Sequence, residues 1–348
     1  MYYIFSGLLI YVFFLSIITK KNKVLSEILG LVLLTFFTVA LGLRYGVGID
    51  YFSYENSFNI HYNTFTYEPL YSLLMYIIKL YFDKFYYLTF IMLFLTNLFI
   101  YLGLKKRKIE GIYILLALFI YFSNTAMTFI NLMRQGLAVA IFFYASTYIT
   151  EKKFKKYLAF ILLGAGFHYS ILLLLPLYFF KFKFTKRRYL ISVIICYVLV
   201  YTKAALKLIN YVASKIPMYS HYYNSHFFRN DEISILSFGV LLNIVVILTL
   251  LLVKENKNLE HSNDVNYYLI GTLFNVMSLS TFIFDRIGMY FFVFGISGIP
   301  ILLMSIKRRK LRNILFMFVF FAIAIYFSQV YLMITESSSL YYRSIFSK

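Results

Sequence analysis

The sequence is poor in charged residues, which make up only 14% of its 348 positions, whereas hydrophobic residues make up 61%. An ordinary globular domain is about 25% charged and about 45–50% apolar. The mean hydropathy of +0.77 points the same way. A soluble protein of this size could not cover so much apolar surface, so the composition excludes one and predicts a polytopic membrane protein.

Acidic residues are scarcer still: 14 Asp and Glu stand against 34 Lys and Arg, which gives a formal net charge of +20. In a soluble protein this excess would suggest binding to nucleic acid. In a membrane protein, Lys and Arg collect in the cytoplasmic loops, so topology explains the excess better. We therefore expect membrane lipids, and no nucleic acid, around the basic segments.

Cysteine is nearly absent, since Cys196 stands alone within an apolar stretch. A single cysteine excludes an internal disulfide, a thiolate cluster and a Cys-ligated metal site. The sequence also lacks the P-loop, G-x-G-x-x-G, G-x-S-x-G and H-E-x-x-H motifs. Its histidines match no compact metal-ligand spacing. We expect no metal and no cofactor.

Apolar runs long enough to cross a bilayer follow one another along the chain. A helix needs about 20 apolar residues to cross roughly 30 Å of hydrocarbon. We expect about twelve transmembrane helices (about 10–13) in an all-α fold with outer-face loops and short interfacial or re-entrant helices. Ten of them correspond to the runs Tyr2–Thr19, Val24–Leu43, Phe85–Leu104, Gly111–Met127, Ile130–Ile149, Tyr189–Thr202, Ile233–Val253, Val265–Phe284, Ile287–Ile306 and Leu311–Met333.

The stretch Phe154–Phe180 is too long for one comfortable span and marginal for two. Gly164, Gly166 and Pro176 interrupt it, which favours two short or re-entrant helices that meet near His168. The apolar run at the start of the chain lacks the basic n-region of a signal peptide, so we expect a retained first span there.

Dense Lys and Arg clusters set the expected orientation, because such clusters remain in the cytoplasm. All of them fall on one side if residues 154–180 cross twice and if Glu68–Phe82 lies on the outer surface as an amphipathic helix. Both termini and the loops 44–84 and 203–232 are then outside, and residues 1–348 form a single membrane domain. The clusters are Lys20–Lys23, Lys105–Lys108, Glu151–Lys156, Lys181–Arg188, Lys254–Lys257 and Lys307–Lys310.

Four groups of polar residues fall on the outer side of this topology, where charge at bilayer depth costs about 2.5–3.5 kcal/mol. The first group begins with Arg44, at the end of the second span, and two glycines follow it. Asp50 then stands beside Tyr51 and Tyr54, and a carboxylate with aromatic faces suits a sugar. The alternative is an interfacial tyrosine belt with an arginine that snorkels to the surface.

The second group is Asn131, Arg134, Gln135 and Ala138. This spacing places all four on one face of a helix. A guanidinium flanked by two amides at a helix N-terminus is suited to bind an anion. The alternative is again an arginine that snorkels to the interface.

The third group is centred on His168, which could act as a base or as a structural hydrogen-bonding residue. The fourth is Asp285 with Arg286, expected in a short turn between two apolar runs, where the two charges could also neutralise each other. Several outward arginines suggest a phosphate-bearing ligand, and carboxylates with tyrosines suggest a carbohydrate. A lipid-linked sugar pyrophosphate carries both.

The four groups together resemble, in order, the motifs of the EpsG family of Wzy-type O-antigen and capsular polysaccharide polymerases. From the first motif to the last they span about two-thirds of the chain. The matching motifs are Arg44-x3-Gly48-x-Asp50-Tyr51-x2-Tyr54 followed by Glu68-Pro69-Leu70-Tyr71, then Asn131-x2-Arg134-Gln135-x2-Ala138, Phe167-His168-x-Ser170, and Asp285-Arg286-x3-Tyr290-Phe291 up to Pro300.

The resemblance implies a multi-pass glycosyltransferase of the bacterial plasma (inner) membrane. Such an enzyme joins undecaprenyl-pyrophosphate-linked repeat units into O-antigen, capsule or exopolysaccharide at the periplasmic or extracellular face. The implied partners are the lipid-linked donor and acceptor glycans and membrane lipids, with a chain-length regulator and a flippase as further candidates. The alternatives are a lipid-linked oligosaccharide flippase or transporter, an O-antigen-type ligase and, last, a structural scaffold.

The resemblance also implies the site residues. We expect Arg134 and Arg286 to hold the donor pyrophosphate and Arg44 to clamp a second phosphate or a sugar acid. Asp50 or His168 would be the base in a metal-independent transfer, with Glu68 in reserve, and the sequence does not choose among the three. The expected catalytic residues are thus Asp50, His168 and Arg134, and the expected substrate contacts are Arg44, Tyr51, Tyr54, Glu68, Asn131, Gln135, Asp285 and Arg286.

Overall fold

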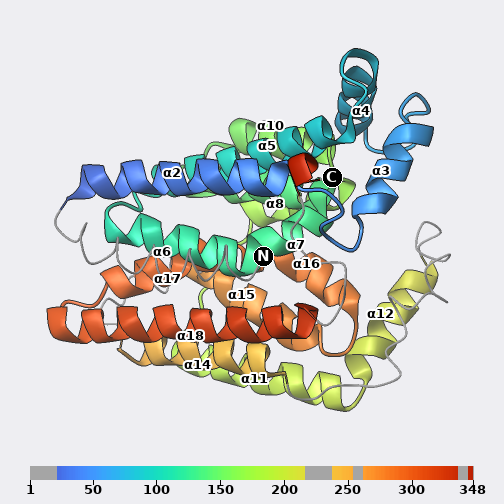
Figure 1. Cartoon of the computed structure of the whole chain (residues 1–348). Coiled ribbons are helices and arrows are strands. Elements are labelled where there is room, and N and C mark those ends of the chain that lie inside the picture. The colour runs from blue at the N-terminus through green and yellow to red at the C-terminus, as the bar shows by residue number, and fades with distance from the viewer. Residues whose placement is uncertain (1–21, 216–236, 254–261, 336–343, 348) are drawn as a thin grey trace. The chain divides into compact units, whose positions relative to one another are not determined.

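The structure, a computed structural model, describes residues 22–215, 237–253, 262–335 and 344–347 (Figure 1). Its regular elements in these ranges are all helical, so the predicted all-α class is confirmed. The expected first span, Tyr2–Thr19, lies outside them. The chain divides into unit 1, Met1–Phe180 with Ile323–Lys348, and unit 2, Lys181–Ala322. The single membrane domain stays a prediction.

Among the residues that the structure describes, three helices are long and apolar enough to cross a membrane: α2 (Lys23–Gly42), α5 (Phe85–Lys106) and α18 (Arg309–Thr335). The number reaches five if each of two bent helix pairs counts as one span. A multi-pass membrane protein is supported, whereas the expected twelve spans are not confirmed. The bent pairs are α11 (Lys186–Tyr201) with α12 (Ala204–Lys215), and α16 (Phe282–Phe292) with α17 (Gly295–Met304).

Several apolar runs are broken inside, which the hydropathy of the sequence does not reveal. The run Gly111–Met127 becomes α6 (Ile112–Ile120) and a π-helical turn, Tyr121–Thr125. The run Ile130–Ile149 breaks at Leu132, whose φ of −113° and ψ of 53° are not helical. Hydropathy shows where an apolar segment begins and ends, but it does not show where the backbone bends within that segment to pack against its neighbours.

Unit 1 is built around α5, which packs between α2 and α8 (Met133–Ala145), while α6 lies along α2 (Figure 1). The side chain of Asn22 caps the start of α2 by accepting a hydrogen bond from the backbone N–H of Leu25 at 3.0 Å. A buried amide, Asn97 on α5, joins the neighbouring elements: it donates to Thr38 at 2.8 Å and accepts from the Tyr121 hydroxyl at 2.6 Å. These bonds satisfy polar groups that would otherwise be costly inside the helix cluster.

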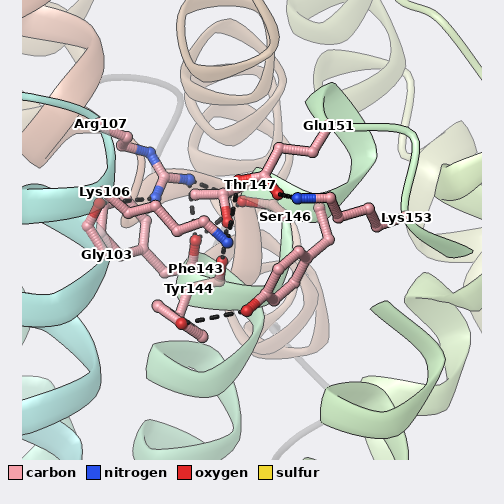
Figure 2. A network of polar contacts seen from close by, with 10 residues as sticks. Gly103, Lys106, Arg107, Phe143, Tyr144, Ser146, Thr147, Glu151 and Lys153 are labelled. Atoms are coloured by element: carbon pink, nitrogen blue, oxygen red, sulfur yellow. Dashed lines mark hydrogen bonds and ion pairs between the residues drawn. The ribbon is translucent and has the colours of Figure 1, made fainter. Parts of the chain in front are cut away.

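The ends of α5 and α8 are tied together by a cluster of polar contacts (Figure 2). The Arg107 guanidinium donates to the carbonyl of Phe143 at 2.8 Å and to the Ser146 hydroxyl at 2.7 Å. Beside it, Lys106 pairs with Glu151 at 3.1 Å. Both helices end at this basic cluster, so they run in the same direction. The opposite, N-terminal end of α8 carries Arg134.

The described part of unit 1 also contains the short elements α3 (Tyr51–Ile60), α4 (Pro69–Tyr81), α10 (Phe154–Ala165), which packs on α8, and the 3-10 helix η2 (Tyr169–Tyr178). The helix expected over residues 68–82 is therefore present as α4. Two short helices also meet near His168, as the interrupted run 154–180 predicts.

Unit 2 places α15 (Asn263–Met277) against α11, α14 (Phe238–Val253), α16 and α17. Gly271 lets α15 approach the backbone of α16 closely, because a Cβ at Gly271 would lie 2.5 Å from the backbone nitrogen of Phe292. The expected turn at Asp285 and Arg286 is wrong: both lie in the first turns of α16, and the break falls at residues 278–281.

Candidate functional site

The centre of the site is the carboxylate of Glu68, which bridges two cationic or basic side chains in unit 1. Its Oε2 lies 2.5 Å from Nη1 of Arg134, and its Oε1 lies 2.8 Å from Nδ1 of His168. The Glu68 side chain is only 6% exposed, whereas those of Arg134 and His168 are 24% and 28% exposed. The carboxylate is thus buried behind two partners that a ligand can still reach.

Local backbone geometry explains how the three residues meet. The backbone N–H groups of Leu70 and Tyr71 donate to the carbonyl of Gly166 at 2.8 and 3.1 Å, which docks the start of α4 on the turn after α10. Gly166 allows this approach, because a Cβ there would lie 2.4 Å from the Leu70 side chain. Glu68 is the N-cap of α4 and His168 is the N-cap of η2, so the docked turn brings both residues together.

Arg134 lies in the first turn of α8 and is flanked by two aromatic rings. Its guanidinium carbon is 4.6 Å from the centre of the Tyr67 ring and 5.5 Å from that of Tyr71. The two rings also meet each other edge to face. Cation–π contact with both rings and the ion pair with Glu68 together fix the position of the guanidinium.

The carboxylate of Glu68 stays ionised at every physiological pH. Burial by itself raises the pKa of this carboxyl, but the hydrogen bond to His168 and the positive charge of Arg134 outweigh burial and lower the pKa to about 2. Its place at the N-terminus of α4 also favours the negative charge.

An ionised Glu68 defines what His168 can do. Since a carboxylate only accepts hydrogen bonds, Nδ1 of His168 carries the hydrogen of that bond. In the neutral ring Nε2 is then the acceptor, so it can remove a proton from a ligand hydroxyl, and the carboxylate stabilises the imidazolium that forms. A carboxylate on one ring nitrogen and an open acceptor on the other is an arrangement suited to general-base catalysis.

Arg44 is placed differently from the expected phosphate clamp. It is 1% exposed, and its guanidinium donates to three carbonyls, those of Val47 at 3.0 Å and of Leu41 and Ile130 at 2.8 Å each. Burial lowers its pKa to about 10, which leaves it charged at neutral pH. These bonds tie the end of α2 to the residues just before α8.

Asn131 holds the same junction from the other side. Its Oδ1 accepts from the backbone N–H of Ile49 at 3.0 Å, and Gly48 (φ 106°) leaves space for the amide, because a Cβ there would meet that oxygen at 2.4 Å. The expectation that Asn131 and Arg134 share one helical face is wrong, since the break at Leu132 ends α7 (Ala126–Asn131) before α8 begins.

The remaining expected residues of unit 1 surround this junction. Asp50 is half-buried at the start of α3 and makes no N-cap hydrogen bond through its side chain. Tyr51 is buried with its ring 5.7 Å from the Arg44 guanidinium. Tyr54, half-buried, lies within electrostatic range of Arg44 and Arg134. Gln135 is buried beside Arg134 on α8.

Asp285 and Arg286 belong to unit 2, where both are half-buried on α16. Their expected contact with the substrate stays a prediction. Within the described ranges of both units, no three His, Cys, Asp or Glu side chains group closely enough to hold a metal ion.

The sequence predicts Glu68 as a substrate contact and only in reserve as the base, and it does not place Tyr67 among the site residues. A signal for both was present. Tyr67 and Tyr71 are four residues apart and bracket Glu68-Pro69, where an acidic N-cap precedes an amphipathic helix. The partner of that carboxylate could not be read from the sequence, because Arg134 and His168 lie 66 and 100 residues further along the chain.

Comparison with known proteins supplies the family. Searches of curated proteins and of solved structures found no match. The model of the EpsG family, a family of Wzy-like polymerases, matches residues 27–344, nearly the whole length, and the chain therefore belongs to this family.

Proposed function

We propose that the chain is a glycosyltransferase that joins undecaprenyl-pyrophosphate-linked repeat units into a surface polysaccharide, in a site built around Glu68. Membership of the EpsG family supports a membrane polysaccharide polymerase. The observation that carries the chemical part is the Glu68 carboxylate bound to both Arg134 and His168. A flippase needs no such general base, so this geometry favours an enzyme over a transporter.

In the proposed step, Nε2 of His168 takes the proton of an acceptor hydroxyl as the hydroxyl oxygen attacks the anomeric carbon of the growing glycan. The bond from that carbon to the pyrophosphate oxygen breaks, and the lipid pyrophosphate leaves with the electron pair. Glu68 is a positioning residue, because it acts through His168 by fixing the ring and stabilising the imidazolium.

The charges of the Glu68 bridge argue against the expected role of Arg134 as a ligand of the donor pyrophosphate. Glu68 neutralises its positive charge at close range, so the pair offers little net charge to a pyrophosphate. We therefore assign Arg134 to holding Glu68 ionised and to contacting the glycan. Arg44, with three carbonyl partners, is assigned to support of the α2 end rather than to phosphate.

The distribution of charge in unit 1 supports an active face outside the cytoplasm. The basic cluster around Lys106 and Arg107 lies where α5 and α8 end, and Arg134 lies where α8 begins. Arg134 and Ser146 are twelve positions apart along α8 and its C-cap, about 18 Å at 1.5 Å per residue. Since basic clusters stay in the cytoplasm and this distance is less than the roughly 30 Å of hydrocarbon, we propose that the Glu68 site lies within the membrane, displaced towards the outer side.

The experiment is the lipid-linked glycan profile of a strain that lacks the protein, with an assay of which leaflet holds the glycan. Single repeat units on the outer leaflet, together with loss of long polymer, are the expected result. The same units held on the cytoplasmic side would identify a flippase, and long lipid-linked polymer that is never attached would identify a ligase. Activity of the purified protein with a chelator present tests the expected metal independence.

A further inference from the structure

Three buried polar atoms in the described part of unit 1 lack any hydrogen-bond partner: Tyr71 Oη, Ser72 Oγ and Arg134 Nε. Leaving such an atom unpaired costs about 1–3 kcal/mol, and folded proteins pair nearly all of them. All three atoms belong to the residues that form or flank the Glu68 bridge. This clustering indicates that the site lacks a partner that comes from outside the chain.

The three atoms lie on two adjoining elements. Tyr71 and Ser72 follow Glu68 in the first turn of α4 and are 1% and 0% exposed. Both belong to the buried face of that helix, and the Tyr71 ring contacts the guanidinium of Arg134. The unpaired atoms therefore belong to Arg134 itself, to a tyrosine whose ring contacts Arg134, and to Ser72, whose backbone N–H donates to the carbonyl of Glu68 at 2.9 Å.

Their chemistry identifies the class of ligand. Two hydroxyls, each able to donate and accept, and one N–H donor are buried and unpaired, while the formal charges of Glu68 and Arg134 cancel. Two tyrosine rings, Tyr67 and Tyr71, lie beside them. Aromatic faces and uncharged hydrogen-bonding groups suit a polyhydroxylated sugar ring, whereas a phosphate would need an excess of positive charge.

We infer that Tyr71, Ser72 and Arg134 form a subsite for a sugar ring of the acceptor glycan, an inference that rests on the proposed transferase function. In this subsite the acceptor ring lies next to the exposed side of His168, so that one of its hydroxyls can reach the base. Tyr67 is half-buried and lies against both Arg134 and Tyr71, so its ring has to move aside for the sugar.

The test compares hydroxyl deletions that leave the packing intact. Tyr71→Phe and Ser72→Ala are placed in full-length protein in nanodiscs. Tyr197→Phe serves as the matched control, because its hydroxyl is also buried and unpaired but lies on α11 of unit 2. The probe is the repeat-unit oligosaccharide released by mild acid from the lipid fraction of the deletion strain. Its binding is measured by saturation-transfer NMR, which needs no turnover.

We expect each site variant to weaken binding of the oligosaccharide about fivefold, the equivalent of one neutral hydrogen bond, and the control to bind as the wild type does. The ligand-free variants should have thermal midpoints equal to or above that of the wild type, since each removes an unpaired polar atom. A purely structural hydroxyl would behave in the opposite way, with a lower midpoint and unchanged affinity.

Several results would overturn the inference. One is an unchanged affinity for the oligosaccharide in both site variants, and another is that the wild type does not bind the oligosaccharide at all. A third is that inorganic pyrophosphate displaces the oligosaccharide and that the site variants bind pyrophosphate more weakly than the wild type does. The proposed transferase function fails separately, through the glycan profile of the deletion strain. Binding that depends on Tyr71 and Ser72 in a protein that polymerises nothing would therefore support the subsite and reject the polymerase.

Discussion

Glu68 and His168 are 100 residues apart in the chain, yet Oε1 of the first lies 2.8 Å from Nδ1 of the second. Helix α4 begins after one of them and η2 begins after the other. The contact thus depends on how the two helix starts dock, and not on either segment alone. It converts a histidine that the sequence leaves without a partner into one half of a proton-transfer pair.

Replacing Glu68 with Gln should lower kcat on lipid-linked repeat units by about 100-fold or more, because the imidazolium of His168 loses its counter-charge. Turnover by reconstituted protein, followed by polymer length, measures this. The matched control is Glu55→Gln, which removes a half-buried carboxylate from α3 that makes no part of the bridge. We expect the control to stay within about twofold of the wild type. Normal turnover in Glu68→Gln would remove the dyad from the mechanism.

Stability should depend on pH through Glu68. Its pKa is lowered from 4.5 to about 2 in the folded chain, so its ionisation stabilises the fold at any pH above 4.5. That contribution declines as the pH falls from 4.5 towards 2. Thermal midpoints between pH 7 and pH 3 should therefore be level down to about 4.5 and fall below it, with a smaller fall in Glu68→Gln. Parallel curves for the two proteins would contradict the lowered pKa.

Arg134→Ala should abolish long polymer and also destabilise the protein. Removing one partner of a buried ion pair leaves the other charge uncompensated, at a cost of about 3–5 kcal/mol. The double variant Arg134→Ala with Glu68→Gln removes both charges, so its thermal midpoint should recover towards that of Glu68→Gln while polymer stays absent. Polymer length and the thermal midpoint of purified protein are the two measurements. A double variant no more stable than the single would show that the pair is not coupled.

The sequence predicts much of this architecture and little of how its parts meet. The apolar runs of α2 and α5, the amphipathic α4 and the two short helices around His168 follow from hydropathy and helix-breaking residues. The breaks inside longer runs do not, because a residue such as Leu132 has no local preference against a helix. The bridge itself is a tertiary contact among three distant segments, which periodicity cannot encode.

Arg44→Lys should reduce stability more than activity. A lysine cannot reach the carbonyls of Leu41, Val47 and Ile130 at once, so at least one buried carbonyl loses its donor, at about 1–3 kcal/mol. We expect a lower thermal midpoint, with an unchanged KM for lipid-linked substrate in the folded fraction. A raised KM at an unchanged midpoint would instead support the phosphate clamp expected from the sequence.

Gly166→Ala tests the docking of α4 without touching any residue of the bridge. The new Cβ would lie 2.4 Å from the Leu70 side chain, so the start of α4 must shift and carry Glu68 away from His168. Since the backbone at Gly166 is helical (φ −63°), alanine itself is tolerated there and the damage comes from the collision alone. We expect a fall in kcat of roughly 10- to 100-fold, because small displacements of catalytic groups are costly.

Adding Leu70→Ala to Gly166→Ala removes the colliding side-chain atoms beyond the Cβ of residue 70, so the double variant should recover most of the turnover. Leu70→Ala alone should have a mild effect. If the double variant is no more active than Gly166→Ala, the contact between Leu70 and Gly166 is not what positions Glu68.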